Sequence, residues 1–265
     1  MPLPLKNTTT VKMPIYATSA TWAHLTYTEA LNRLESTADP FLGAISMDKV
    51  QLCPQNQGFN DLASIMRLVE SYPDTKFRLH ADVKVVGRKS KADLCWYDEQ
   101  NISNWKCIAD ISNAINAECY SLHAGEAVCT LDEMFLKHEQ LQKLFNCPVA
   151  IEGHYPTGKK YLLHNWDEHR ILLESGIGFV VDLSHFNIIA KRYGWDENLV
   201  IDMLSNKNCL EVHVSDNEGI TDSHQPIQTE PYWWKFVKHT TADIFYEGNH
   251  SIIELRKNNP NWYRK

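Results

Sequence analysis

The chain has 265 residues, of which 43% are hydrophobic and 11% aromatic, so it can fill a substantial core and is not a disordered protein. Its formal net charge is −7, the wrong sign for a surface that follows a phosphate backbone, and nucleic acid is not an expected partner. Seven cysteines occur without a CxxC pair in a chain too large to need disulfide staples, which predicts reduced thiols and a cytoplasmic location. No run of about 18 apolar residues is present, so no membrane span is expected.

Short apolar runs of the kind that form buried strands recur along the whole sequence. There are eight of them, at Pro14–Trp22, Phe41–Ser46, Lys76–His80, Cys119–His123, Pro148–Glu152, Gly178–Asp182, Leu210–Val214 and Asp243–Glu247. Between them lie stretches with apolar residues at spacings of three and four, the period of an amphipathic helix. These helical stretches are Thr28–Ser36, Asn60–Ser71, Ile102–Ala117, Leu131–Phe145, Asp167–Ser175, Glu197–Ser205 and Tyr232–His239.

This alternation of strands and helices predicts a parallel sheet covered by helices, and eight units are the number that closes a barrel. The alternative, an open doubly wound sheet, would usually carry a glycine-rich phosphate loop after its first strand, and residues 15–25 contain no glycine. We therefore predict an α/β fold, a single (β/α)8 TIM barrel that forms one domain over residues 1–265, with residues 1–13 as an irregular N-terminal segment.

Side chains that bind metals follow six consecutive predicted strands. The nine residues concerned are His80, His123, Glu152, Asp182, His185, His213, Asp222, His224 and Glu247. In a TIM barrel the carboxyl ends of the strands meet at one rim, where function gathers. A single histidine or carboxylate at a strand end is more often a hydrogen-bonded structural residue, but six in succession predict a metal site, since so many clustered carboxylates are costly to bury without cations.

Nine ligand-type residues exceed what one ion needs, so a cluster of two or three ions is expected. Glu152, Asp182, His213 and Glu247 make one four-ligand centre, and they are also the expected catalytic residues. His80 and His123 can share the Glu152 carboxylate with a second ion. His185, Asp222 and His224 can hold a third.

The segments LHADVKV, SLHAGE, AIEGH, VDLSH, HVSDNEGITDSHQPI and FYEGN together resemble the xylose isomerase-like TIM-barrel superfamily. That superfamily includes sugar isomerases and epimerases, endonuclease IV and the multinuclear non-haem iron enzymes that oxidise peptides. The first two branches usually follow the Asp-x-His of this loop with Pro, an apolar residue and Gly-Glu-Gly. Here Pro226 and Ile227 are kept, but Gln228, Thr229 and Glu230 replace the glycine-containing turn.

Three further features resemble the peptide-oxidising branch. They are the Gly seven residues after His80 (Gly87), the Ser-x-His of Ser121 and His123, and a Trp eleven residues beyond Asp222 (Trp233). Two positions depart from that branch, because Gly153 and His185 stand where its members commonly have Asn.

The resemblance implies three functions, all of a metalloenzyme with a peptide or small-molecule substrate. The favoured one is iron- and oxygen-dependent oxidation of a cysteine-containing peptide. It implies two or three bound ions, with iron preferred over zinc or manganese. A partner protein that delivers the substrate is a further possibility that this resemblance implies. A second is a sugar isomerase or epimerase in which Glu152 and Glu247 act as acid and base. A third is a phosphodiesterase that resembles endonuclease IV.

Overall fold

The computed structural model describes residues 13–58, 61–81, 93–98, 100–251 and 254. The predicted irregular segment at 1–13 lies outside this range except for Met13, and so does Gly87. The start of the second predicted helix, at Asn60, is also outside it.

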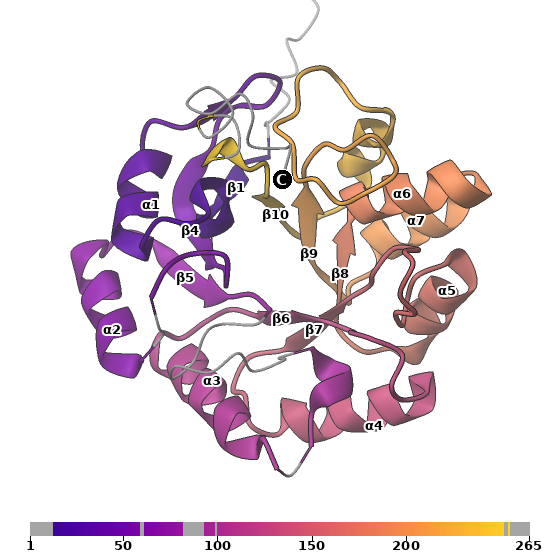
Figure 1. Cartoon of the computed structure of the whole chain (residues 1–265), viewed down its shortest axis with the longest axis horizontal. Helices are drawn as coiled ribbons and strands as arrows, with labels where there is room; N and C mark the ends of the chain where they lie inside the picture. Colours follow the sequence, from indigo (N-terminus) through magenta and orange to yellow (C-terminus); the bar gives the residue numbers. More distant parts are fainter. Residues whose placement is uncertain (1–12, 59–60, 82–92, 99, 252–253, 255–265) are drawn as a thin grey trace, which may run out of the picture.

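Eight parallel strands form a nearly closed barrel with helices around its outside, which confirms the predicted fold class (Figure 1). Around the barrel the strands are ordered β5, β4, β1, β10, β9, β8, β7 and β6. Their bounds are β1 Ile15–Thr18, β4 Ser46–Leu52, β5 Lys76–Leu79, β6 Tyr120–His123, β7 Val149–Glu152, β8 Phe179–Asp182, β9 Cys209–Val214 and β10 Asp243–Tyr246. The gap between β5 and β6 is closed by a single bridge, in which the Ala81 amide donates to the Ser121 carbonyl at 2.7 Å.

The helices alternate with these strands along the chain. The α-helices are α1 Tyr27–Leu34, α2 Leu62–Ser71, α3 Ile102–Ala114, α4 Leu131–Gln142, α5 Trp166–Ser175, α6 Leu183–Tyr193 and α7 Glu197–Ser205. The described part of the chain also contains three 3-10 helices, η1 Ser19–Trp22, η2 Leu94–Trp96 and η3 Tyr232–His239, so the helix predicted at 232–239 is of the 3-10 type.

The predicted second strand, Phe41–Ser46, is wrong. Residues 38–44 instead form a small antiparallel hairpin of β2 Ala38–Asp39 and β3 Gly43–Ala44, and the barrel strand is β4. The hairpin turns because the Asp39 carboxylate accepts the amides of Phe41 and Leu42, both at 2.9 Å, and Gly43 takes a left-handed φ of 82°. β4 was not predicted because its sequence contains charged and polar residues, which are unusual in a buried strand. In the structure, Lys49 and Gln51 pair with carboxylates of other strands.

Helix α6 was not predicted, and it begins directly at the end of β8. The Asp182 carboxylate caps it by accepting the amides of Ser184 at 2.6 Å and His185 at 3.1 Å. Because no turn separates the strand from the helix, the sequence has no Gly or Pro there to mark where the helix begins.

The inside of the barrel is polar near the rim and is organised by the two-residue period of the strands. A side chain two positions before a rim residue faces the same interior, one level lower. Arg78, Ser121 and Glu211, which precede His80, His123 and His213 by two, are all less than 5% exposed and hydrogen bond across the barrel. The outward-facing residues of the strands pack against the helices as the main apolar core.

The packing of α4 provides a test of the fold. Met134 is fully buried, so Met134→Ala should lower the free energy of unfolding by about 2–5 kcal/mol through lost transfer energy and a cavity. Leu136 on the same helix is 60% exposed, and Leu136→Ala should change it by no more than about 0.5 kcal/mol. Urea unfolding of both variants measures the difference; equal losses would mean that α4 does not lie on the barrel with this face.

Candidate metal centre

A cavity of about 540 Å³ opens at the carboxyl ends of the strands. Seven of the nine predicted ligands line it: His80, His123, Glu152, His185, Asp222, His224 and Glu247. The remaining two, Asp182 and His213, lie against the others and are buried, with exposures of 2% and 0%. The structure therefore brings all nine residues together.

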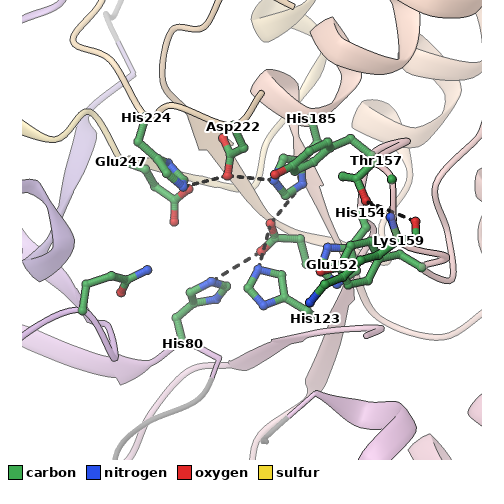
Figure 2. Close-up of a pocket in the computed structure, with 14 residues that line it drawn as sticks. His80, His123, Glu152, His154, Thr157, Lys159, His185, Asp222, His224 and Glu247 are labelled. Carbon is green, nitrogen blue, oxygen red and sulfur yellow. Dashed lines mark hydrogen bonds and ion pairs between the residues drawn. The ribbon is translucent and has the colours of Figure 1, made fainter. Parts of the chain in front are cut away.

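Glu152, at the end of β7, is the hub of this cluster (Figure 2). Its carboxylate oxygens lie 3.1 Å from His213 Nδ1, 3.4 Å from His185 Nδ1, 3.5 Å from His80 Nε2 and 3.6 Å from His123 Nε2. These four imidazoles come from four different places on the chain, and each reaches the same carboxylate because successive parallel strands end at the same rim.

A second set of contacts surrounds Asp222 in the long loop after β9. Asp222 Oδ2 lies 2.7 Å from His224 Nε2 and 3.3 Å from His185 Nε2. Glu247 links this set to the first, since its carboxylate oxygens are 3.4 Å from His213 Nδ1 and 3.7 Å from His224 Nδ1. His224 itself has a left-handed φ of 43°, a strained conformation for a residue other than glycine.

Donor atoms meet within 4.8 Å of one another in several groups of three. One group is Asp182, His213 and Glu247, a second is His80, His123 and Glu152, and a third is Glu152, Asp182 and His185; a fourth contains His80, Glu211 and His213. The first group contains three of the four residues of the first predicted centre, and the second group is the second predicted centre. The third predicted centre, His185, Asp222 and His224, does not form such a group; His185 instead meets Glu152 and Asp182.

The unpaired atoms of the cluster fit a metal site. Glu152 Oε2, Asp182 Oδ2 and His213 Nδ1 are buried and make no hydrogen bond of acceptable geometry with the residues that the structure describes, although Glu152 Oε2 and His213 Nδ1 are 3.1 Å apart. A buried polar atom without a partner is costly, and three that converge indicate that something else satisfies them. Oxygen and imidazole donors are the ligands that iron, zinc and manganese accept, so the residues present fit such ions.

The other nitrogen of three imidazoles is held by a neighbour that fixes the ring. His80 Nδ1 lies 3.0 Å from Ser121 Oγ, His185 Nδ1 lies 2.9 Å from the Gly153 carbonyl, and His213 Nε2 lies 3.2 Å from Glu211 Oε2. A histidine ligand commonly donates its second N–H to such a partner. The nitrogens left for ions are therefore Nε2 of His80 and His185 and Nδ1 of His213.

Protonation reflects the excess of negative charge in the cluster. Burial alone lowers the pKa of His213, but Glu247 and Glu152 raise it well above its ordinary value. Burial likewise opposes a rise at His224, where Asp222 raises the pKa to about 10. Burial raises the pKa of Glu247 to about 7 and lowers that of His80 to about 3. Without metal, bound protons supply the positive charge that the carboxylates require.

The loop between β7 and α5 adds cavity residues that were not predicted. His154 stacks between His123 and Tyr161, with ring centroids 5.0 and 4.2 Å away, and Tyr155 lies 4.8 Å from His185. Gln55 and Lys159 also line the cavity. His154 had a signal in the sequence, since it stands two residues beyond Glu152 and continues the direction of the strand.

Two of the positions compared with the iron enzymes now have structural explanations. Gly153, where those enzymes commonly have Asn, is required because a Cβ there would lie 2.3 Å from His169 Nε2. Trp233 is buried, with an exposure of 1%, and is a core residue that does not line the cavity.

No family model and no curated protein matches the sequence. Among solved structures, a D-tagatose 3-epimerase-like protein is 14% identical with a TM-score of 0.65, covering 95% of this chain and 97% of that one. A xylose isomerase domain-containing protein from Salmonella typhimurium is 12% identical with a TM-score of 0.60, covering 96% and 100%. A Thermus thermophilus protein soaked with zinc chloride is 13% identical with a TM-score of 0.54, covering 94% and 99%.

The structural neighbours are thus xylose isomerase-like TIM-barrel proteins, and the fold of this chain is similar to theirs. Within the described part of the chain, no helix has both the length and the apolar character needed to cross a membrane.

The raised pKa values predict a pH-dependent stability for the metal-free protein. Groups whose pKa is higher in the folded state stabilise it fully below their unfolded values, and this contribution is lost as the pH rises through about 7 for Glu247 and about 10 for His224. The Tm of the chelator-treated protein should therefore fall between pH 6.5 and 8.5, and added Zn²⁺ should restore it at pH 8.5.

His224→Asn should make this fall in Tm shallower, because the variant no longer carries the raised imidazole. The matched control is His24→Asn, since His24 is exposed and also has a left-handed φ, of 69°, which Asn tolerates. An identical slope for both variants would contradict the assignment of the effect to the cluster.

The contact between Gly153 and His169 gives a second prediction. Gly153→Ala should lower the free energy of unfolding by about 1–3 kcal/mol through overpacking, whereas Gly158→Ala, where a Cβ meets nothing within 4 Å, should change it by no more than about 0.5 kcal/mol. Adding His169→Ala to Gly153→Ala should cost less than the sum of the single changes. Additive losses in chemical unfolding would rule out the clash as the cause.

Proposed function

We propose that this chain is a multinuclear metalloenzyme and that its reaction is the iron- and oxygen-dependent oxidation of a cysteine-containing peptide. The observation that carries the proposal is the Glu152 carboxylate, which is buried, faces four imidazoles at 3.1–3.6 Å and has an oxygen without a hydrogen-bond partner among the described residues. A structural ion pair would need one such imidazole, whereas a bridging ligand needs several.

Nine side chains would hold the ions in three groups, the first two of which share Glu152. Asp182, His213, Glu247 and Glu152 form the first, His80, His123 and Glu152 the second, and His185, Asp222 and His224 the third. Ions bound there would supply redox chemistry with dioxygen and positive charge to attract a substrate thiolate.

The donor set supports a sulfur ligand from the substrate. All nine candidate ligands offer nitrogen or oxygen, and none of the seven cysteines lines the cavity. Lys159 also lines the cavity, and its side chain is 69% exposed and pairs with Glu126 at 3.3 Å, so a peptide carboxylate could reach it by competing with Glu126. A thiol-bearing side chain could therefore enter while the rest of a peptide stays outside.

His154 is placed to accept a hydrogen bond from an entering substrate group. Burial lowers the pKa of His154 well below its ordinary value, so the ring is neutral, and its Nε2 has no hydrogen-bond partner in the described part of the chain. Burial raises the pKa of Tyr155 to about 12, so this neighbouring wall residue keeps its proton and can donate a hydrogen bond to the bound substrate.

A phosphodiesterase is the second candidate, and one feature favours it. The His185, Asp222 and His224 group adds a third set of donors on the same side of the cavity, which three-ion phosphodiester cleavage would use. A sugar isomerase accounts for fewer of the candidate ligands. It needs Glu152, Asp182, His213 and Glu247 and leaves the other five ligand-type residues without a role.

Metal content is the decisive measurement. Protein purified without added metal should contain two or three irons per chain and show ligand-to-metal absorption in air. Adding N-acetylcysteine amide under anaerobic conditions should shift this absorption, and the matched N-acetylserine amide should not. Zinc or manganese alone, with no spectral response to the thiol, would contradict iron-dependent oxidation and leave the phosphodiesterase to be tested.

Glu152→Gln tests the bridging carboxylate. The variant should lose at least one bound ion per chain, because one carboxylate serves two groups of donors. Glu139→Gln, at a side chain on α4 that is 70% exposed, is the control and should keep the metal content of the wild type. Unchanged metal in Glu152→Gln, with the circular dichroism spectrum intact in both variants, would refute the site.

A further inference from the structure

A layer of buried polar side chains lies one level below the candidate ligands. It contains Gln51, Arg78, Ser121 and Glu211, from four different strands, with exposures of 0%, 3%, 0% and 0%. None of these residues lines the cavity, so none is placed to touch a substrate. Three of them contact the ligands above: Ser121 lies against His80, and Gln51 and Glu211 lie against His213, whereas Arg78 contacts Glu211.

Glu211 is the centre of this layer, and both of its oxygens are fully used. Oε2 accepts from Gln51 Nε2 at 2.8 Å and lies 3.2 Å from His213 Nε2, while Oε1 accepts from Arg78 Nη1 at 2.9 Å. This differs from Glu152 and Asp182 at the rim, each of which has a buried oxygen without such a partner in the described chain.

The contact with Glu211 decides which nitrogen of His213 faces the candidate ions. Carboxylates face both nitrogens of His213, so the metal-free ring can hold a proton on each. An ion bound at Nδ1 would displace the proton there, and Glu211 would accept a hydrogen bond from the proton that stays on Nε2. The lone pair then sits on Nδ1, which lies 3.1 Å from Glu152 and 3.4 Å from Glu247. The opposite tautomer would place a lone pair against the Glu211 carboxylate and a proton where an ion has to bind.

Below Glu211, basic side chains continue the network toward the other end of the barrel. Arg78 Nη2 also donates to Asp243 at 2.7 Å, and Lys49 Nζ donates to Asp243 at 2.7 Å and to Glu118 at 2.6 Å. Arg78 therefore approaches Glu211 from the side opposite His213 and holds the carboxylate ionised in an interior that would otherwise disfavour the charge.

We propose that Glu211 is the positioning residue of the metal centre: it holds His213 with Nε2 protonated and Nδ1 presented to the ion shared with Asp182 and Glu247. This inference rests on the proposed function, because it requires that the rim binds metal. Glu211 is not itself a ligand in this arrangement, although its donor atom lies within 4.8 Å of those of His80 and His213.

The experiment is a Zn²⁺ titration of the metal-free full-length protein and of two variants. Glu211→Gln keeps the shape of the side chain but replaces one accepting oxygen with a donating amide, and it should weaken the binding of one ion by about 10–100-fold. Asp243→Asn removes one charge from the lower contact of Arg78, which also donates to Glu118, and it leaves Glu211 in place, so the variant should bind Zn²⁺ within about threefold of the wild type by the same argument.

A spectroscopic measurement on the wild type makes the test independent of any variant. Nitrogen-15 NMR of histidine-labelled, zinc-loaded protein should show one imidazole coordinated through Nδ1 with a protonated Nε2, and this signal should change in Glu211→Gln. Coordination of His213 through Nε2, or equal zinc affinity of Glu211→Gln and wild type, would overturn the proposal. Failure of the wild type to bind zinc or iron at all would instead overturn the proposed function.

Discussion

The structure depends on how the barrel accommodates carboxylates that are removed from water. Two layers solve the problem differently. In the lower layer, Glu211 is neutralised by Arg78, so the protein supplies its own cation. In the upper layer, the basic side chains that face Glu152, Asp182 and Glu247 among the described residues are imidazoles, which are poor cations unless they take up protons. Within this part of the chain, protons or metal ions from solution are therefore the available source of positive charge for the upper layer.

The two carboxylate oxygens of Asp182 have different roles. One oxygen caps helix α6, which starts at the next residue, and this fixes the side chain against the end of β8. The other oxygen is buried and is left to the cluster. A ligand of the candidate centre is thus held rigidly by secondary structure, with no loop to adjust.

The sequence was sufficient for the features that follow from local periodicity. Seven of the eight barrel strands lay within or next to the predicted runs, and the rim residues were found because a strand that ends in His, Asp or Glu points it at the rim. β4 was missed because its interior residues Lys49 and Gln51 are polar, and their partners come from strands far away in the chain. Helix α6 was missed because its cap is also a strand residue.

The second layer was equally hidden in the sequence. Glu211 and Arg78 look like ordinary charged residues of a short strand, and only the closed barrel shows that they meet across 133 positions of the chain. Tyr155 and Lys159 were missed for a related reason. They stand on a loop whose place is set by backbone hydrogen bonds to the neighbouring loop, such as that from the Leu162 amide to the Gly125 carbonyl at 3.0 Å.

The single bridge between β5 and β6 implies that the metal centre also affects the stability of the barrel. Elsewhere each strand is joined to its neighbour by two to four residue pairs, whereas in the described chain β5 and β6 are joined by one bridge, next to His80. His80 belongs to one side of this seam and His123 to the other, and both reach the Glu152 carboxylate. An ion bound by both imidazoles would cross-link β5 and β6, the neighbouring strands with the fewest paired residues. Metal binding would then also stabilise the closure of the barrel.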